Sequence, residues 1–337
     1  TPFNKFMDER PNDTGVAQYH FNTAKLNDFL TKFAIDKGIN VIDDEITSVN
    51  VSEWNKVQTI QGEKELYDYD FYIDCTGFSR LLISAVGSEW QSYSKYLKMK
   101  EAIVFPTPEG DEIPIWTLAK AMDAGWMFRI PVQGRTGNGY IFDSDFITAE
   151  QAHTEVEKYL GHGVEVAKHI KFDPGTLDKA WIGNVCAIGL SQSFVEPLEA
   201  SSIGSSINQT FLLAQRLVNY NEETINRYNL EVTAIMDNIR DFIVLHYITE
   251  RRDTPFWKAV SEVTLPDSLD KNLRMWKVRM PIADDMTTHT KKVLFNEYNY
   301  ALVMHGLGLF DNESILKQYE TVPQGAKDHV EQSIQHK

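Results

Sequence analysis

Two carboxylates and several serine hydroxyls gather in one short stretch, residues 193–204, with the sequence SFVEPLEASSIG. The stretch follows an apolar, strand-like run at 184–189 and precedes an amphipathic stretch at 207–218, so a turn between strand and helix is predicted. The first amides of a helix have no partner within it, and they sit at the positive end of the helix dipole. The sequence therefore predicts an anion or cofactor site at this turn, with Glu199 as an acid/base group beside it.

A mixed α/β layer is expected to position this turn. Asn22 can cap a helix that ends at Gly38, because the apolar residues between Leu26 and Ala34 recur at helical spacing. Short strands are predicted at 40–42, 47–51, 57–60, 71–78 (where the strand runs into a glycine turn), 102–105, 113–118, 126–132 and 140–142. Helical patterns dominate after Ser202, including one long helix at 222–250. A mixed sheet followed by helices is typical of a cofactor-binding layer joined to a substrate-binding layer.

Composition excludes some classes of function. The chain has 337 residues, of which 42% are hydrophobic and 24% charged, which is ordinary for a globular protein with a substantial core and one or two domains. Its net charge of -15 argues against binding to nucleic acid or to an anionic membrane surface. No apolar run approaches the roughly 20 residues of a membrane span, and no signal segment opens the chain.

The two cysteines, Cys75 and Cys186, each lie in an apolar, strand-like run. This predicts two buried, reduced thiols and a cytoplasmic protein. No cluster of His, Cys and Asp has the spacing of metal ligands. The chain begins at Thr1 in a loop-like segment rich in Asn, Asp and Pro, so we expect further residues before it in the native polypeptide.

Five segments, taken in chain order, carry a resemblance. They are Tyr19-His-Phe-Asn22; Asp74-Cys-Thr-Gly-Phe78; Gly125-Trp-Met-Phe-Arg-Ile-Pro131 with Gly137-Asn-Gly-Tyr140; Phe194-Val-Glu-Pro-Leu-Glu199; and Leu245-His-Tyr247 with Arg252-Asp-Thr-Pro-Phe-Trp257. Together they resemble the flavin-dependent halogenases of the tryptophan-halogenase family. Each segment alone is moderately specific, whereas their common order makes the resemblance strong.

The resemblance implies a fold. Members of that family have a flavin-monooxygenase-like, FAD-binding box of mixed α/β type and a helical, pyramid-shaped substrate domain. Applied to this chain, the resemblance predicts the box at residues 1–219 and the helical substrate-binding region at residues 220–337. No Gly-x-Gly-x-x-Gly follows an N-terminal strand, so the glycine-rich N-terminal part of the FAD fold is not in this sequence. The family's active-site lysine would lie before Thr1.

The resemblance also implies a reaction. Reduced FAD (FADH2), supplied by a separate flavin reductase, reacts with O2, and a halide ion becomes hypohalous acid. This oxidant halogenates an electron-rich aromatic substrate with the help of a lysine and a glutamate. The family's glutamate matches Glu199, and Glu196 is the weaker candidate for that role. A homo-oligomer is left open.

Matching positions supply the remaining site residues. Backbone amides after the family's glutamate contact halide, and the matching residues here are Ser201 and Ser202. Because the family prefers Ser-Thr-Gly where this chain has Ala200-Ser-Ser202, we expect halide preference and rate to differ. Contacts with the cofactor are implied for Asp74, Gly77, Trp126, Phe128, Gly189, Leu190, Ile203 and Gly204. Among these, Trp126 and Phe128 would wall off the flavin from the substrate.

Plainer interpretations stay open. Ser201 and Ser202 can simply cap the following helix, and Trp126 and Phe128 can form one face of a core strand. The alternatives to a halogenase are an FAD-dependent aromatic monooxygenase and a non-catalytic, truncated homologue. The sequence after about Met280 matches the tryptophan-specific members weakly. We therefore hypothesise that the substrate is a phenol, indole or related arene other than free tryptophan.

Overall fold

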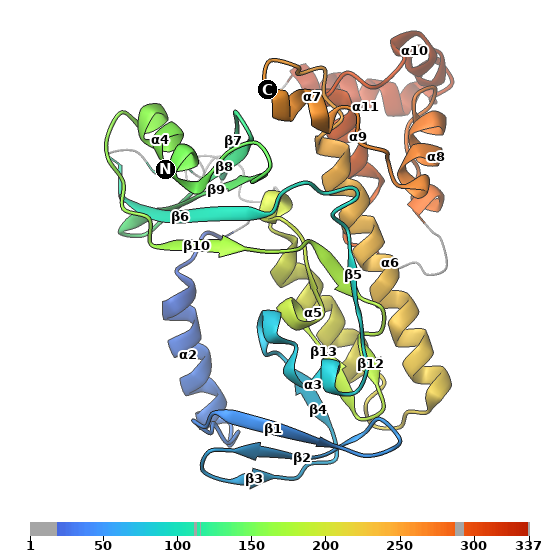
Figure 1. Ribbon diagram of the computed structural model, residues 1–337. Coiled ribbons are helices and arrows are strands. Elements are labelled where there is room, and N and C mark those ends of the chain that lie inside the picture. Colours follow the sequence, from blue (N-terminus) through green and yellow to red (C-terminus); the bar gives the residue numbers. More distant parts are fainter. Residues whose placement is uncertain (1–18, 111–112, 115, 287–292, 336–337) are drawn as a thin grey trace. The chain divides into compact units, whose positions relative to one another are not determined.

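The computed structural model describes residues 19–110, 113–114, 116–286 and 293–335 (Figure 1). The chain divides into two compact units. Unit 1 comprises Thr1–Ser94, Lys98–Ser202 and Arg251–Val260, and unit 2 comprises Lys95–Leu97, Ile203–Glu250 and Ser261–Lys337. The functional division predicted at residue 219, between a flavin-binding box and a substrate-binding region, stays a prediction.

Unit 1 contains the strands and a few helices. Its strands are β1 (Ile46–Val51), β2 (Val57–Gly62), β3 (Leu66–Tyr67), β4 (Tyr72–Asp74), β5 (Trp90–Ser92), β6 (Glu101–Pro108), β7 (Leu118–Met122), β8 (Gly125–Val132), β9 (Arg135–Phe142), β10 (Lys168–Lys171), β11 (Gly175–Leu177), β12 (Trp181–Ile182), β13 (Val185–Ala187) and β14 (Ser193–Phe194). Its helices are α2 (Thr23–Asp36), α3 (Leu81–Ala85), α4 (Ala149–Leu160) and α7 (Pro255–Val260), with 3-10 turns η1 (Gly77–Ser79), η2 (Gly189–Ser191) and η3 (Pro197–Glu199).

A five-stranded antiparallel sheet with the order β10-β6-β9-β8-β7 forms the larger layer of unit 1. Helix α4 covers one face of it, and buried Ala152 and Val156 pack on apolar side chains of β6 and β9 (Figure 1). A capping box between Thr148 and Gln151 begins this helix, which ends at Gly161. The sheet therefore holds β8, which carries the predicted wall residues, between two neighbouring strands.

Smaller sheets complete unit 1. Strand β4 runs parallel to β13, and β12 pairs with β13 on its other side. Strand β11 joins β5 to β14, while β1, β2 and β3 form an antiparallel meander. Apolar residues of β2, β4, α3 and β13 make one buried core cluster. Because β4 ends at Asp74 and β13 ends at Ala187, the loops after them leave the same edge of the parallel pair.

Unit 2 is helical over the part of it that the structure describes. Its elements are α5 (Ser201–Ala214, whose first two residues belong to unit 1), α6 (Glu222–His246), α8 (Asp267–Trp276), the 3-10 turn η4 (Ala283–Met286), α9 (Glu297–Gly306), α10 (Asn312–Glu320) and α11 (Gln324–Gln335). Asn221 caps α6 by accepting from the Thr224 amide, and the apolar residues that recur at helical spacing from Tyr228 to Ile243 form a buried stripe. The long helix is thus confirmed, although it ends at His246 and not at residue 250.

The mixed α/β class and the Asn22 cap of the first helix are confirmed. Two strand predictions are wrong. Residues 40–42 lie in an irregular segment ahead of β1. The strand expected at 113–118 begins only at Leu118, and residues 111–112 and 115 lie outside the described part. Apolar content alone suggested both strands, but no partner strand pairs with residues 40–42 or with the described residues of the second segment ahead of Leu118.

The prediction of two buried thiols is half right. Cys186 lies within β13 and is buried, as expected. Cys75 is exposed, because β4 ends one residue before it and the chain turns there. Across the described ranges, no helix is long and apolar enough to cross a bilayer.

Candidate active site

The predicted turn between strand and helix is present, and its backbone is tightly folded. It passes from β14 through the single 3-10 turn η3 into α5. Pro197 occupies the first position of η3, and the Ala200 amide donates to the Pro197 carbonyl at 3.0 Å. Ala200 adopts the left-handed conformation with φ 49° and ψ 32°, which costs roughly 1 kcal/mol for a residue with a Cβ. This strained residue reverses the chain directly before the first amides of α5.

The two carboxylates of the turn lie in different environments. Glu196 is 0% exposed, and its Oε1 accepts a hydrogen bond of 3.0 Å from the indole Nε1 of Trp126. Glu199 is partly exposed, at the end of η3. A buried carboxylate needs donors, whereas a partly exposed one can meet a ligand. The placement favours Glu199 over Glu196 as the group that could touch a substrate.

Ser201 and Ser202 are the first residues of α5, so the helix starts two residues before Ile203, where the cap interpretation placed its start. Ser201 is buried and Ser202 is exposed. Ile203 and Gly204 follow in the same first turn, and Ile203 is 54% exposed. The first turn of a helix presents amides without intrahelical partners. An anion-binding geometry at Ser201 and Ser202 is therefore compatible with their position.

Asp74 joins two of the predicted cofactor loops. One of its oxygens accepts from the amide and hydroxyl of Thr76 and from the Ser191 hydroxyl at 3.1 Å. The other accepts from the Leu82 and Ile83 amides at 2.8 and 2.9 Å, and so caps α3. Asp74 is fully buried. Its carboxylate thus fixes the 74–80 loop to η2.

Gly77 and Gly189 both have positive φ, 68° and 69°, as loops that turn sharply after a strand require. Beside them, Phe78 and Leu190 are exposed apolar residues. The Phe78 ring meets Phe194 of β14 edge to face, with centroids 5.2 Å apart. The loop that holds Gly77 therefore also contacts the strand that leads into the Glu199 turn.

Trp126 and Phe128 lie on the same face of β8, with ring centroids 6.1 Å apart. Trp126 is buried and Phe128 partly buried, while Met127 is buried on the opposite face. The Phe128 ring lies over Gly139 of β9, where an added Cβ would come within 2.5 Å of it. Gly139 is thus needed for packing against the Phe128 ring. The core-strand interpretation of the two rings is compatible with a wall beside a ligand.

Three side-chain contacts therefore connect the segments of unit 1 that hold predicted residues: Asp74 with Ser191, Phe78 with Phe194, and Trp126 with Glu196. The family model for tryptophan halogenase matches residues 4–321. The chain belongs to the tryptophan halogenase family. It is 32% identical over 301 residues to the tryptophan 6-halogenase SttH of Streptomyces toxytricini, covering 86% of this chain and 57% of that protein.

Solved structures agree with this membership. A thermophilic tryptophan halogenase (Th-Hal) from Streptomycin violaceusniger superposes with a TM-score of 0.84 at 29% identity, covering 91% of this chain and 62% of that one. BrvH, a flavin-dependent halogenase from Brevundimonas sp. BAL3, gives a TM-score of 0.79 at 28% identity, with 85% and 59% covered. The chain thus spans about 60% of the length of these halogenases.

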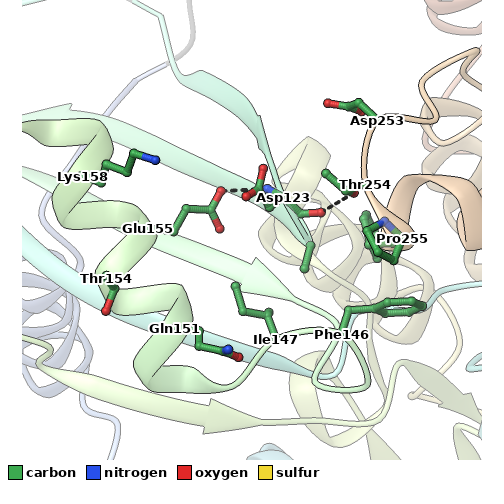
Figure 2. Close-up of a pocket in the computed structure, with 12 residues that line it drawn as sticks. Asp123, Phe146, Ile147, Gln151, Thr154, Glu155, Lys158, Asp253, Thr254 and Pro255 are labelled. Carbon is green, nitrogen blue, oxygen red and sulfur yellow. Dashed lines mark hydrogen bonds between the residues drawn. The ribbon is translucent and has the colours of Figure 1, made fainter.

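Unit 1 also contains a cavity that is lined by none of the predicted site residues. A cavity of about 490 Å³ lies in unit 1 between α4, the turn joining β7 to β8, and the segment ahead of α7 (Figure 2). Phe146 and Phe256 form part of its wall and meet edge to face at 5.8 Å. The Thr254 hydroxyl donates to the Asp123 carbonyl at 2.7 Å, and the Asp123 amide donates to Glu155 at 2.8 Å. These bonds tie the three segments together.

Charge in this cavity is mostly negative. Asp123, Glu155 and Asp253 face it together with one cation, Lys158 (Figure 2). Burial raises the pKa of the Glu155 carboxyl, although the Asp123 amide donates to it. Nothing in the sequence pointed to this cavity, because polar residues on an amphipathic helix are normally solvated. No group of His, Cys, Asp and Glu that could hold a metal ion occurs among the described residues.

Proposed function

We propose that this chain carries the halide and acid/base site of a flavin-dependent halogenase. The observation that carries the proposal is the η3–α5 turn: a partly exposed carboxylate, Glu199, lies two residues before the first amides of a 14-residue helix. The Trp126–Glu196 bond holds the same turn against β8. A carboxylate beside an anion-binding helix start suits a reaction between a halide-derived oxidant and an arene.

Reduced FAD fits the loops of unit 1. The glycines with positive φ, Gly77 and Gly189, let the backbone come close to a ligand, and a Cβ at Gly77 would meet open space. Phe78 (43% exposed) and Leu190 (38% exposed) offer apolar surface beside them for a flat ring. We propose that these loops, with Trp126 and the others named above, hold FADH2, which when bound supplies the electrons that let O2 oxidise a halide ion to hypohalous acid.

The residues of the turn would have different roles in halide binding and in acid/base catalysis. The amides of Ser201 and Ser202 would hold the halide, because they lie at the positive end of the helix dipole. Glu199 would stabilise positive charge on the arene and accept the proton that halogenation releases. Trp126 and Phe128 would separate the cofactor from the arene. The exposed Ser202 hydroxyl beside the halide amides is where this chain departs from the family's glycine, so halide preference is expected to differ there.

The substrate proposal is an electron-rich arene, with a phenol or indole other than free tryptophan as the specific hypothesis. Supply of FADH2 by a separate reductase, a homo-oligomer and a cytoplasmic location belong to the same proposal. Equal or better turnover of free tryptophan over a panel of phenols and indoles would contradict the substrate hypothesis and leave the halogenase proposal standing.

The experiment combines the native full-length protein with FAD, a flavin reductase, O2 and chloride or bromide, and measures product mass. A halogenated arene is expected. An added oxygen without halogen would support the aromatic monooxygenase instead, and no modified arene would support a non-catalytic homologue.

Glu199→Gln tests the site. It should lower halogenation by roughly 100-fold, the size typical of losing an acid/base group, while FAD binding is retained. Glu165→Gln is the matched control, because Glu165 is an exposed carboxylate in the loop after α4. Near-normal turnover by Glu199→Gln would remove Glu199 from its proposed role.

A further inference from the structure

We infer that Glu196 is a positioning residue: its buried carboxylate fixes the Trp126 ring and anchors the turn that carries Glu199. The inference rests on the proposed function, and it assigns a role to the carboxylate that sequence comparison treats only as a weaker catalytic candidate. Glu196 itself would touch neither substrate nor halide.

Burial and hydrogen bonding carry the first step. Glu196 is 0% exposed, and the Trp126 indole Nε1 donates to its Oε1 at 3.0 Å within a buried environment. Indole has a single N–H donor, so this bond uses the whole hydrogen-bonding capacity of the ring. A carboxylate out of water is unfavourable without such donors. The bond therefore selects the one ring orientation that points Nε1 at Glu196.

The second step follows from the strand that carries Trp126. Strand β8 lies between β7 and β9, with Trp126 opposite Ala121 on one side and Ile141 on the other. A residue paired on both sides in a sheet is a rigid reference point. The hydrogen bond therefore fixes the position of Glu196 relative to this sheet, although Trp126 and Glu196 are 70 positions apart in the chain.

The third step transmits that position to Glu199. Glu196 directly precedes Pro197, whose φ is fixed by its ring. The 3-10 turn that follows contains only Pro197, Leu198 and Glu199, and the bond from the Ala200 amide to the Pro197 carbonyl closes it. The turn has few free torsions. A shift at Glu196 is thus passed on to Glu199, so the two carboxylates have separate tasks of anchor and reacting group.

Spectroscopy tests the contact without any assumption about activity. In protein labelled with 15N-tryptophan, Trp126→Phe identifies the indole N–H signal of Trp126. Glu196→Leu should move or broaden that signal, while Glu196→Gln, which keeps a carbonyl acceptor, should largely preserve it. Asp173→Ala is the matched control, because it removes the exposed acceptor of the Trp90 indole, which Asp173 contacts at 3.0 Å; it should affect the Trp90 signal alone. An unchanged Trp126 signal in Glu196→Leu would overturn the anchor.

Steady-state kinetics test whether Glu196 positions Glu199 for the reaction. Misplacement by about 1 Å can lower a rate by roughly 100-fold, so Glu196→Leu should lower kcat far more than it raises KM, and Glu196→Gln should restore most of kcat. If Glu196→Leu does not fold, Trp126→Phe removes the same bond from the other side, and it should lower kcat while KM stays close to that of the parent. Wild-type levels of kcat in the folded variant that lacks the bond would overturn the positioning role.

These experiments distinguish a failure of the proposed halogenase function from a failure of the positioning role of Glu196. If the parent protein produces no halogenated arene, the proposed function fails, and the indole signals still decide whether Glu196 anchors Trp126. If the parent is active and the variants without the bond are equally active, the positioning role fails and the halogenase proposal stands.

Discussion

Replacement of Asp74 should loosen the centre of unit 1. Its carboxylate accepts from five donors, and three of these bonds lie in buried surroundings: those from the Leu82 amide, the Ile83 amide and the Ser191 hydroxyl. In Asp74→Ala these three donors lose their acceptor in a place that water does not reach. The Thr76 amide and hydroxyl are partly buried and can turn to solvent.

The magnitude follows from those three donors. Leaving a buried donor unsatisfied costs about 1–3 kcal/mol, and loss of a helix cap costs about 1 kcal/mol, which overlaps with the two amide terms. Because such terms are not additive, we expect Asp74→Ala to destabilise unit 1 by about 4 kcal/mol. In Asp74→Asn an amide NH2 would face the Leu82 and Ile83 N–H groups, so about 2 kcal/mol is expected. Ser191→Ala removes one donor and should cost about 1 kcal/mol.

Urea unfolding gives the free-energy differences, and hydrogen exchange of peptides from α3 and η2 locates them. Exchange should rise in both peptides for the Asp74 variants, and mainly in η2 for Ser191→Ala. Asp178→Asn is a comparison at an exposed aspartate that also accepts from a backbone amide, that of Glu89. A stability for Asp74→Asn within about 0.5 kcal/mol of the parent, the usual effect of a neutral surface change, would refute the reasoning.

Two more predictions concern unit 2 and the β8–β9 pair. The Arg279 guanidinium lowers the pKa of Asp285 from 3.8 to about 2. The ionised Asp285 therefore stabilises the fold above about pH 4, and this stabilisation is lost as the pH falls toward 2. In an acid titration, Asp285→Asn should therefore flatten the loss of stability in that window, and an unchanged titration would contradict it. Gly139→Ala should lower stability by about 1–3 kcal/mol, because its methyl would overlap the Phe128 ring. Gly137→Ala, whose nearest neighbour would be the Arg135 guanidinium at 3.3 Å, should cost less, and thermal unfolding of the two variants makes the comparison.

Periodic elements could be predicted from the sequence because their signals are local. The α6 stripe repeats at helical spacing along a helix of 25 residues, and Asn221 marks the start of that helix. The predicted turn at 193–204 was also local: a strand, a proline, two carboxylates and a helix start. These features need no knowledge of distant residues, and the structure confirms the elements they predict.

Long-range contacts could not be predicted in the same way. Alternation along β8 gave no reason to expect that Trp126 donates to Glu196, so the two carboxylates of the turn could be ranked only by resemblance. Nothing along the strand indicated that Gly139 lies under the Phe128 ring. The exposed Cys75 was assigned to a strand because its apolar neighbours hide the end of β4. The first two cases depend on contacts with a different strand or turn.

The separations explain why the site depends on tertiary structure. Asp74 and Ser191 are 117 positions apart, and Trp126 and Glu196 are 70 apart. Contacts of this kind gain free energy only after the chain between them has been ordered. The helix start at Ser201 can form locally, but Glu199 acquires its position only when η2 and β8 hold residues 189–196. A peptide spanning residues 184–214 should therefore lack the site geometry even where it is helical, since both anchors are missing from it.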